Sequence, residues 1–151
     1  MAIVTVGELM DRARDFELRL EVYYAEIRDR SKDNGVRLLT YYLARHRRHQ
    51  EQALAGLDPD RVGHVRMVEL KFDAPFDLDA GRQMPYAPPE TIQGDELIEM
   101  AVGHDRELVS LYRSVLVQPV GDDARTVLEA LIRVEERDMV MLKKMQAMHY
   151  F

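Results

Sequence analysis

Four stretches of this chain carry apolar residues at the three- and four-residue spacing of a helix, and no other feature constrains the fold as strongly. They span about 6–31, 34–56, 92–117 and 122–148. Apolar side chains at this spacing lie on one face of a helix, so each stretch predicts an amphipathic helix. Short turns separate the first two stretches and the last two. We therefore expect each pair to form an antiparallel hairpin.

The segment 57–91 between the two hairpins lacks this spacing and is rich in proline. Proline removes a backbone donor and restricts the residue before it, so a continuous helix is excluded here. We expect a long connection, with one short extended piece within 66–72. Two helical hairpins joined by a long crossover predict a single all-α domain, a four-helix bundle, over residues 1–151.

Size, charge and cysteine content narrow the functional classes. A chain of 151 residues is long enough to bury one core and too short to expect two domains. It has no cysteine, which excludes a disulfide framework and a cysteine-ligated iron centre. Its net charge of -6 disfavours nucleic-acid binding. No stretch approaches the ~20 apolar residues of a membrane span, so we expect a soluble cytoplasmic protein that binds neither nucleic acid nor membrane.

Two of the predicted helices each carry a pair of metal-capable side chains. His46 and His49 lie three residues apart in the second helix, and Glu135 and Asp138 have the same spacing in the fourth. Each pair follows an apolar lead-in on what should be the buried face of its helix. The sequence thus places two potential ligand pairs in the interior of the bundle.

The first hairpin is repeated in the second. Glu17 of the first helix corresponds to Asp105 of the third, and His46 of the second helix corresponds to Glu135 of the fourth. Side chains that occupy one register in a bundle are expected to meet at the same height. The sequence therefore predicts one metal site with six ligands: Glu17, His46, His49, Asp105, Glu135 and Asp138.

On these residues the chain resembles the ferritin-like superfamily, and within it the rubrerythrin-type di-iron proteins, over nearly its whole length. Glu17 with Tyr24 and Asp105 with Tyr112, at equal spacing, carry the resemblance together with the paired sites. The resemblance implies two irons in the bundle centre, reaction with oxygen or peroxide, and a homodimer. Redox turnover would need an external electron donor, because a chain without cysteine has no built-in rubredoxin-like centre.

The ligand set departs from that family. Where the family has Glu-x-x-His twice, this chain has His46-x-x-His49 and Glu135-x-x-Asp138, and Asp105 replaces a glutamate. Four carboxylates and two imidazoles still neutralise two divalent ions, and the mixture suits iron, manganese or zinc. An imidazole does not bridge two metals as a carboxylate does, and an aspartate has a shorter reach. We therefore expect one ion, or two ions held unequally.

Two functional interpretations remain open. The first is a metal-binding protein for iron handling or for peroxide or oxygen reduction in oxidative-stress defence. The second is a non-enzymatic relic bundle whose degenerate metal site leaves a structural or protein-interaction module. Whether the chain is an enzyme is not decided by the sequence.

Three further residues are candidates for supporting groups near these ligands. Tyr24 and Tyr112 are expected in the core with their hydroxyls at its rim, and the alternative is that they orient ligands. His104 is expected to be a packed, half-buried histidine, and the alternatives are an extra ligand or an acid–base group.

Overall fold

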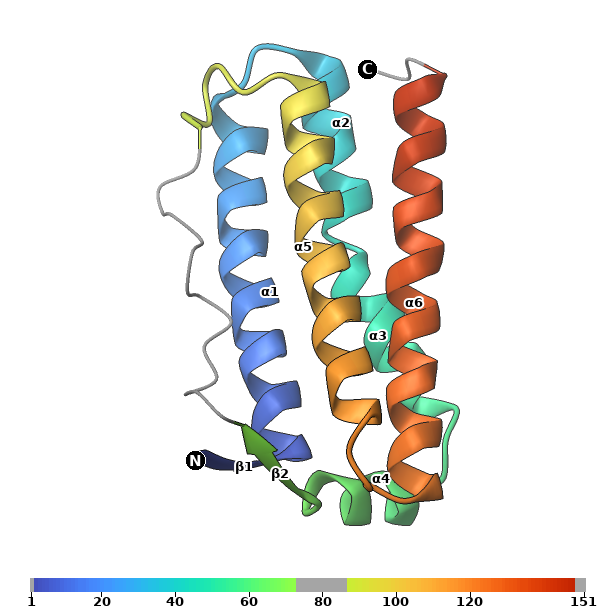
Figure 1. Ribbon diagram of the computed structural model, residues 1–151. Coiled ribbons are helices and arrows are strands. Elements are labelled where there is room, and N and C mark those ends of the chain that lie inside the picture. Colours follow the sequence, from blue (N-terminus) through green and yellow to red (C-terminus); the bar gives the residue numbers. More distant parts are fainter. Residues whose placement is uncertain (1, 73–86, 149–151) are drawn as a thin grey trace.

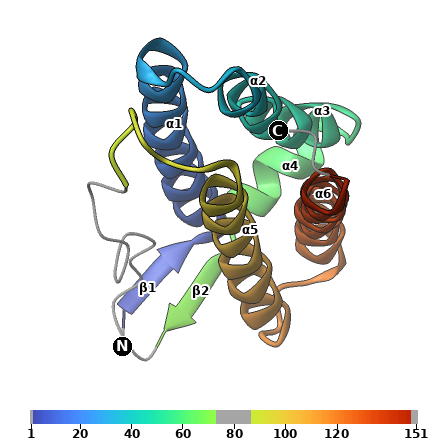
Figure 2. The same ribbon diagram turned by 90° about the horizontal axis from the view of Figure 1, so that it is seen from above.

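The computed structural model describes residues 2–72 and 87–148, and it is mostly helical (Figure 1). No helix in that part of the chain is both long enough and apolar enough to cross a membrane. The long helical elements run side by side, with α3 continuing the line of α2 (Figures 1 and 2). They are α1 (Val6–Arg30), α2 (Asn34–Leu43), α3 (His46–Ala55), α5 (Gly94–Leu116) and α6 (Asp122–Ala147).

Polar side chains cap the starts of α1 and α2. The Thr5 hydroxyl oxygen accepts a hydrogen bond from the Glu8 amide at 3.1 Å, which confirms the predicted start of α1. Asp33 caps α2 by accepting from the Gly35 amide at 2.8 Å. At the last turn Gly121 adopts a φ of 89°, a left-handed conformation that glycine reaches at low cost, and α6 follows. These short turns return the chain on itself twice.

The predicted helix 34–56 is divided in two. Between α2 and α3, the Arg45 amide bonds to the Tyr42 carbonyl at 3.2 Å, a tight three-residue turn in place of the α-helical pattern. Neither residue at the break, Ala44 or Arg45, is a proline or glycine, so the sequence carries no breaking signal there. The turn lies directly before His46, and α3 packs against α6.

The connection between the hairpins contains ordered structure. Strand β2 (Glu69–Phe72) pairs antiparallel with β1 (Ala2–Thr5), so the extended piece expected within 66–72 is confirmed over its second half. The short helix α4 (Pro59–Arg66) precedes β2 and was not predicted. Proline is tolerated in the first turn of a helix, where its missing N–H costs nothing, and Asp58 caps this one.

Strand β1 was also missed, because so short an extended segment has no pattern of its own. Residues 73–86 of the predicted crossover lie outside the described part of the chain. The α4 helix and the strand pair cover the end of the molecule where α1 begins (Figure 1).

Apolar side chains form two cores, one on each side of a polar layer. The first core lies toward α4 and the strands and includes Val65, Leu70, Leu108 and Leu128. The second lies toward α2 and the start of α5 and includes Leu20, Ile27, Leu39, Leu97 and Leu142. The residues between the two cores form the site described next.

Candidate metal centre

Three carboxylates are buried in the polar layer between the cores. Glu17 comes from α1, Asp105 from α5 and Glu135 from α6, with exposed fractions of 3%, 4% and 0%. No lysine or arginine among the described residues is buried. A carboxylate removed from water without a positive partner costs several kcal/mol. The layer therefore needs protons, buried imidazolium groups or a bound cation.

His46, the first residue of α3, faces these acids. Its Nε2 atom lies 2.5 Å from Glu135 Oε2, 3.4 Å from Asp105 Oδ1 and 3.8 Å from Glu17 Oε1. Acids from three different helices thus surround a single ring nitrogen. His46, Asp105 and Glu135, which we call the His46 group, offer one ligand atom each, and these atoms lie within 4.8 Å of one another.

The opposite nitrogen of His46 is held by Asp138, which also contacts His49; both are predicted ligands that lie outside this group. The Asp138 carboxylate accepts a hydrogen bond from His46 Nδ1 at 2.5 Å, and His49 Nδ1 lies 3.0 Å from the same oxygen. Because Nδ1 donates its hydrogen to a carboxylate, Nε2 is the nitrogen that remains free to coordinate a metal, as in carboxylate–histidine–metal arrangements. Asp138 and His49 therefore lie behind His46, where they can orient it.

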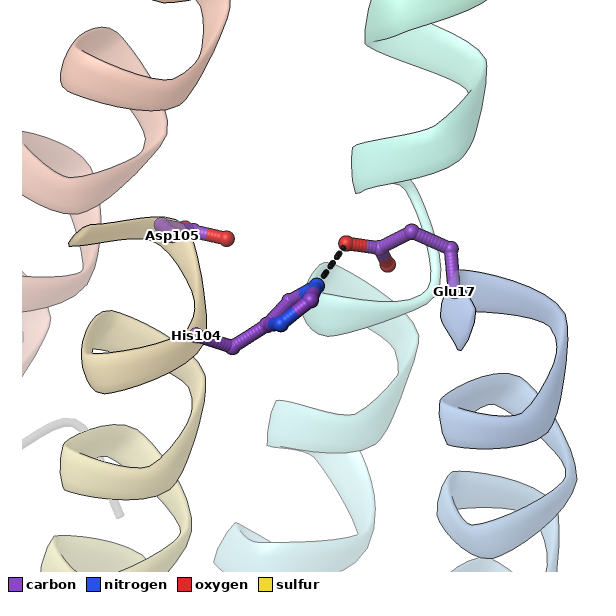
Figure 3. Close-up of side chains that lie close together, drawn as sticks. All are labelled: Glu17, His104 and Asp105. Carbon is purple, nitrogen blue, oxygen red and sulfur yellow. Dashed lines mark hydrogen bonds and ion pairs between the residues drawn. The ribbon is translucent and has the colours of Figure 1, made fainter. Parts of the chain in front are cut away.

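A second group surrounds His104. His104 Nε2 lies 2.7 Å from Glu17 Oε1, and Asp105 is its neighbour on α5 (Figure 3). One ligand atom each from Glu17, His104 and Asp105 lies within 4.8 Å of the others; we call these residues the His104 group. The prediction that His104 is half-buried is wrong, because its exposed fraction is 5%. It packs on Phe16 with the ring centroids 4.5 Å apart.

The two groups share Asp105 and use only nitrogen and oxygen ligands. Each group combines one imidazole with two carboxylates, which suits iron, manganese or zinc and not a soft, thiolate-preferring ion. The two oxygens of the Asp105 carboxylate allow it to serve both groups. The geometry thus gathers two overlapping groups of potential ligands, each of which could hold a metal ion.

Two buried polar atoms of the centre have no hydrogen-bond partner among the residues that the structure describes. They are His104 Nδ1 and Glu135 Oε2, the latter facing His46 Nε2 as an ion pair without hydrogen-bond geometry. Buried polar atoms nearly always have a partner, so each exception calls for an explanation. Both atoms belong to residues of the two ligand groups, and a cation held by the His46 group would satisfy Glu135 Oε2.

Crowded negative charge shifts the pKa values of the centre. Burial raises the pKa of Asp105 well above its usual range, and the charges of Glu135 and Glu17 act in the same direction against His46. Burial lowers the pKa of His46, but the Asp105 charge, the hydrogen bond to Asp138 and the Glu135 carboxylate beside the ring outweigh it and leave this pKa well above 6.5. Without a metal, the centre retains protons that a cation would displace.

Gln50 belongs to the centre and was not predicted. Its Nε2 donates to Glu135 Oε1 at 2.5 Å and lies 3.2 Å from His46 Nε2. Gln50 follows His46 by four residues, so helical spacing alone puts both on one face. A search for polar residues at that spacing, without the restriction to metal ligands, would have found it.

The structure thus brings together four of the six predicted ligands, Glu17, His46, Asp105 and Glu135, and places His49 and Asp138 beside them. Tyr24 and Tyr112 are both buried, as expected for core tyrosines. Tyr112 is buried completely, and burial raises its pKa well above 10, with further contributions from the neighbouring acids.

Comparisons with known proteins do not assign a function to this centre. No protein-family model matches the chain, and neither a curated protein nor a solved structure matches it significantly. The chemistry of the residues themselves therefore carries the functional argument.

Proposed function

We propose that this protein binds two divalent transition-metal ions, iron foremost, held unequally by the His46 group and the His104 group. The observation that carries the proposal is the convergence of three buried carboxylates with no buried lysine or arginine in the described chain. Two imidazoles face these acids, and one of them keeps an unpartnered nitrogen. Bound cations would compensate the charge of these carboxylates and satisfy the unpartnered oxygen of Glu135.

We further propose that the fold is a ferritin-like four-helix bundle related to the rubrerythrin type. Two helical hairpins with a long connection, and ligands from all four helical lines, support this assignment. The ligand set differs from the two Glu-x-x-His motifs of that type, since imidazoles come from α3 and α5. The corresponding function is iron handling or peroxide or oxygen reduction in a homodimer, with electrons from an external donor.

Each residue has a definite task in such a centre. Glu17, Asp105 and Glu135 supply three of the negative charges that offset the cations. Asp138 directs His46 Nε2 toward them, and Gln50 holds one oxygen of Glu135 so that the other faces His46. Bound iron would supply the electron-transfer and Lewis-acid chemistry that these side chains lack.

Metal analysis tests this proposal directly. Tag-free protein purified without chelator should take up about two equivalents of Fe(II) in an anaerobic titration, and manganese and zinc should compete for the same positions. Asp105→Asn removes the shared ligand and should reduce uptake to near zero. Asp95→Asn, on the exposed first turn of the same helix, is the matched control and should bind as the parent does.

The opposite outcome favours the structural or protein-interaction module. Uptake below about a tenth of an equivalent, unchanged by Asp105→Asn, would mean that protons and internal hydrogen bonds alone satisfy the polar layer. Circular dichroism on both variants would show that the comparison is made between folded proteins.

A further inference from the structure

A cavity of about 430 Å³ opens between the α2–α3 line and α6 and reaches the metal centre. Its volume lies within the range of small-molecule sites, about 300–1,000 Å³. Residues of both ligand groups, among them Glu17, His46 and His104, line its inner end. The cavity therefore connects the buried centre to the surface.

One wall of this cavity is apolar. Leu43 from α2, Ala101 from α5, and Leu142 and Met145 from α6 line it. Along α6 the lining of the cavity runs from Asp138 to Met145, about two turns or ~10 Å of helix, and it is apolar from Met141 onward. The space beside it suits an elongated apolar body, such as an alkyl chain of medium length.

Two arginines line the same cavity and project into solvent. The Arg45 guanidinium lies 5.3 Å from the Tyr42 ring centroid, and among the described residues no ion pair to a carboxylate is formed by Arg45. Arg137 has Asp138 as a neighbour, at 3.8 Å. Arg47, in contrast, is held by Glu21 and by Glu51 at 2.9 Å each. Arg45 and Arg137 can therefore still bind an anion at the mouth.

We propose that the cavity binds a free aliphatic monocarboxylate of medium chain length, with its carboxylate at Arg45 and Arg137 and its chain along the apolar wall. The orientation follows from charge, because the acids at the inner end repel a carboxylate and the arginines at the mouth attract it. A role for this ligand as substrate rests on the proposed metal function, whereas its binding does not.

Three probes with the same chain test the head group: octanoate, octylamine and 1-octanol. Isothermal titration against the full-length protein, metal-free and again loaded with zinc, should give octanoate as the tightest ligand in both states. Equal or tighter binding of octylamine or 1-octanol would overturn the proposal. Octanoate binding without any metal uptake would keep the pocket and remove only the proposed metal function.

Variants locate the ligand. The double change Arg45→Gln and Arg137→Gln should weaken octanoate binding about tenfold or more and leave 1-octanol unaffected, because charge-assisted hydrogen bonds are lost and apolar contacts are not. Arg133→Gln, one turn earlier on the exposed side of α6, is the matched control and should bind normally.

Ala101→Leu narrows the apolar wall and should weaken octanoate and 1-octanol alike. Octanoate affinity that survives both the arginine pair and Ala101→Leu would place the ligand elsewhere and refute the assignment.

Discussion

The His46 group and the His104 group share Asp105 but differ in what lies behind each imidazole. His46 Nδ1 bonds to Asp138, which also contacts His49, so an outer layer of polar residues holds the ring. His104 Nδ1 is buried without a hydrogen-bond partner, and the ring is held by packing on Phe16. The outer side of one histidine is thus held by a hydrogen bond, whereas the other histidine packs on an aromatic ring and contacts Glu17 through its inner nitrogen alone.

This difference indicates how two metal positions of unequal affinity can arise in a bundle whose two hairpins are similar in sequence. Outer hydrogen-bond partners fix the orientation of a ligand and raise its basicity, and they commonly change metal affinity 10–100-fold. The His46 group has such partners on both His46 and Glu135, since Gln50 bonds to the latter. We therefore expect the position at the His46 group to fill first.

The largest expected effect separates the two histidines. His46→Ala should weaken binding at the tighter position by about 100-fold or more, whereas His104→Ala should remove the weaker equivalent and leave the tighter one nearly unchanged. Competition titration with a chelator of known affinity measures both. His64→Ala, an exposed histidine on α4, is the control. Equal losses from the two ligand variants would show that the groups act as one site.

A smaller effect is expected from the outer layer of the His46 group. Asp138→Asn keeps the shape of the side chain but removes the charge that orients His46 Nδ1. We expect the tighter position to weaken by about 10–100-fold, with the weaker position unchanged. The same chelator competition reports both positions, and a uniform loss at both would argue that Asp138 is itself a ligand.

The smallest effect concerns the stability of the metal-free protein. The pKa of His46 is raised by folding. Its contribution to the stability of the folded protein is therefore fully present below pH 6.5 and is lost as the pH rises through the folded-state pKa. The pKa of Asp105 is also raised, so its contribution to stability likewise falls as the pH rises above 3.8. We expect the free energy of unfolding to fall by about 1 kcal/mol between pH 6 and pH 8 in chelator.

Urea titrations at several pH values measure this dependence. The lowered pKa of Asp138 works in the opposite sense, but its stabilisation is lost only as pH falls below 3.8. Bound metal should reverse the trend above pH 6, because protons compete with the cation for the ligands. Stability that rises with pH in the presence of chelator would show that the metal-free centre does not hold its protons.

Most of the helices can be predicted from the sequence, because a helix depends on the spacing of apolar residues along the chain. The ends of α1 and α6 lie within about one residue of the predicted segments. Helix α4 and strand β1 were missed, since segments this short carry little periodic signal. The break before α3 was missed as well, because Ala44 and Arg45 are compatible with a continuous helix.

The residues of the centre could be predicted only in part, because helical spacing shows which side chains share a face but not which of them points inward. Helical spacing places His46, His49 and Gln50 on overlapping faces, and the chain alone does not say which of them points inward. The tertiary structure turns Gln50 to Glu135 and leaves His49 at the mouth of the cavity. Likewise His104 and Asp105 are adjacent on α5, and both reach the centre because α1 offers Glu17 to the former.

The sequence by itself determined which helices form and which of their faces carry acids and imidazoles, since both follow from residue spacing along one chain. Only the tertiary structure decided that these side chains divide into two groups around Asp105, with Asp138 behind His46. That division depends on how α3 packs against α6 and on how α5 is placed relative to α1. Distances between helices are set by packing, and local periodicity carries no information about them.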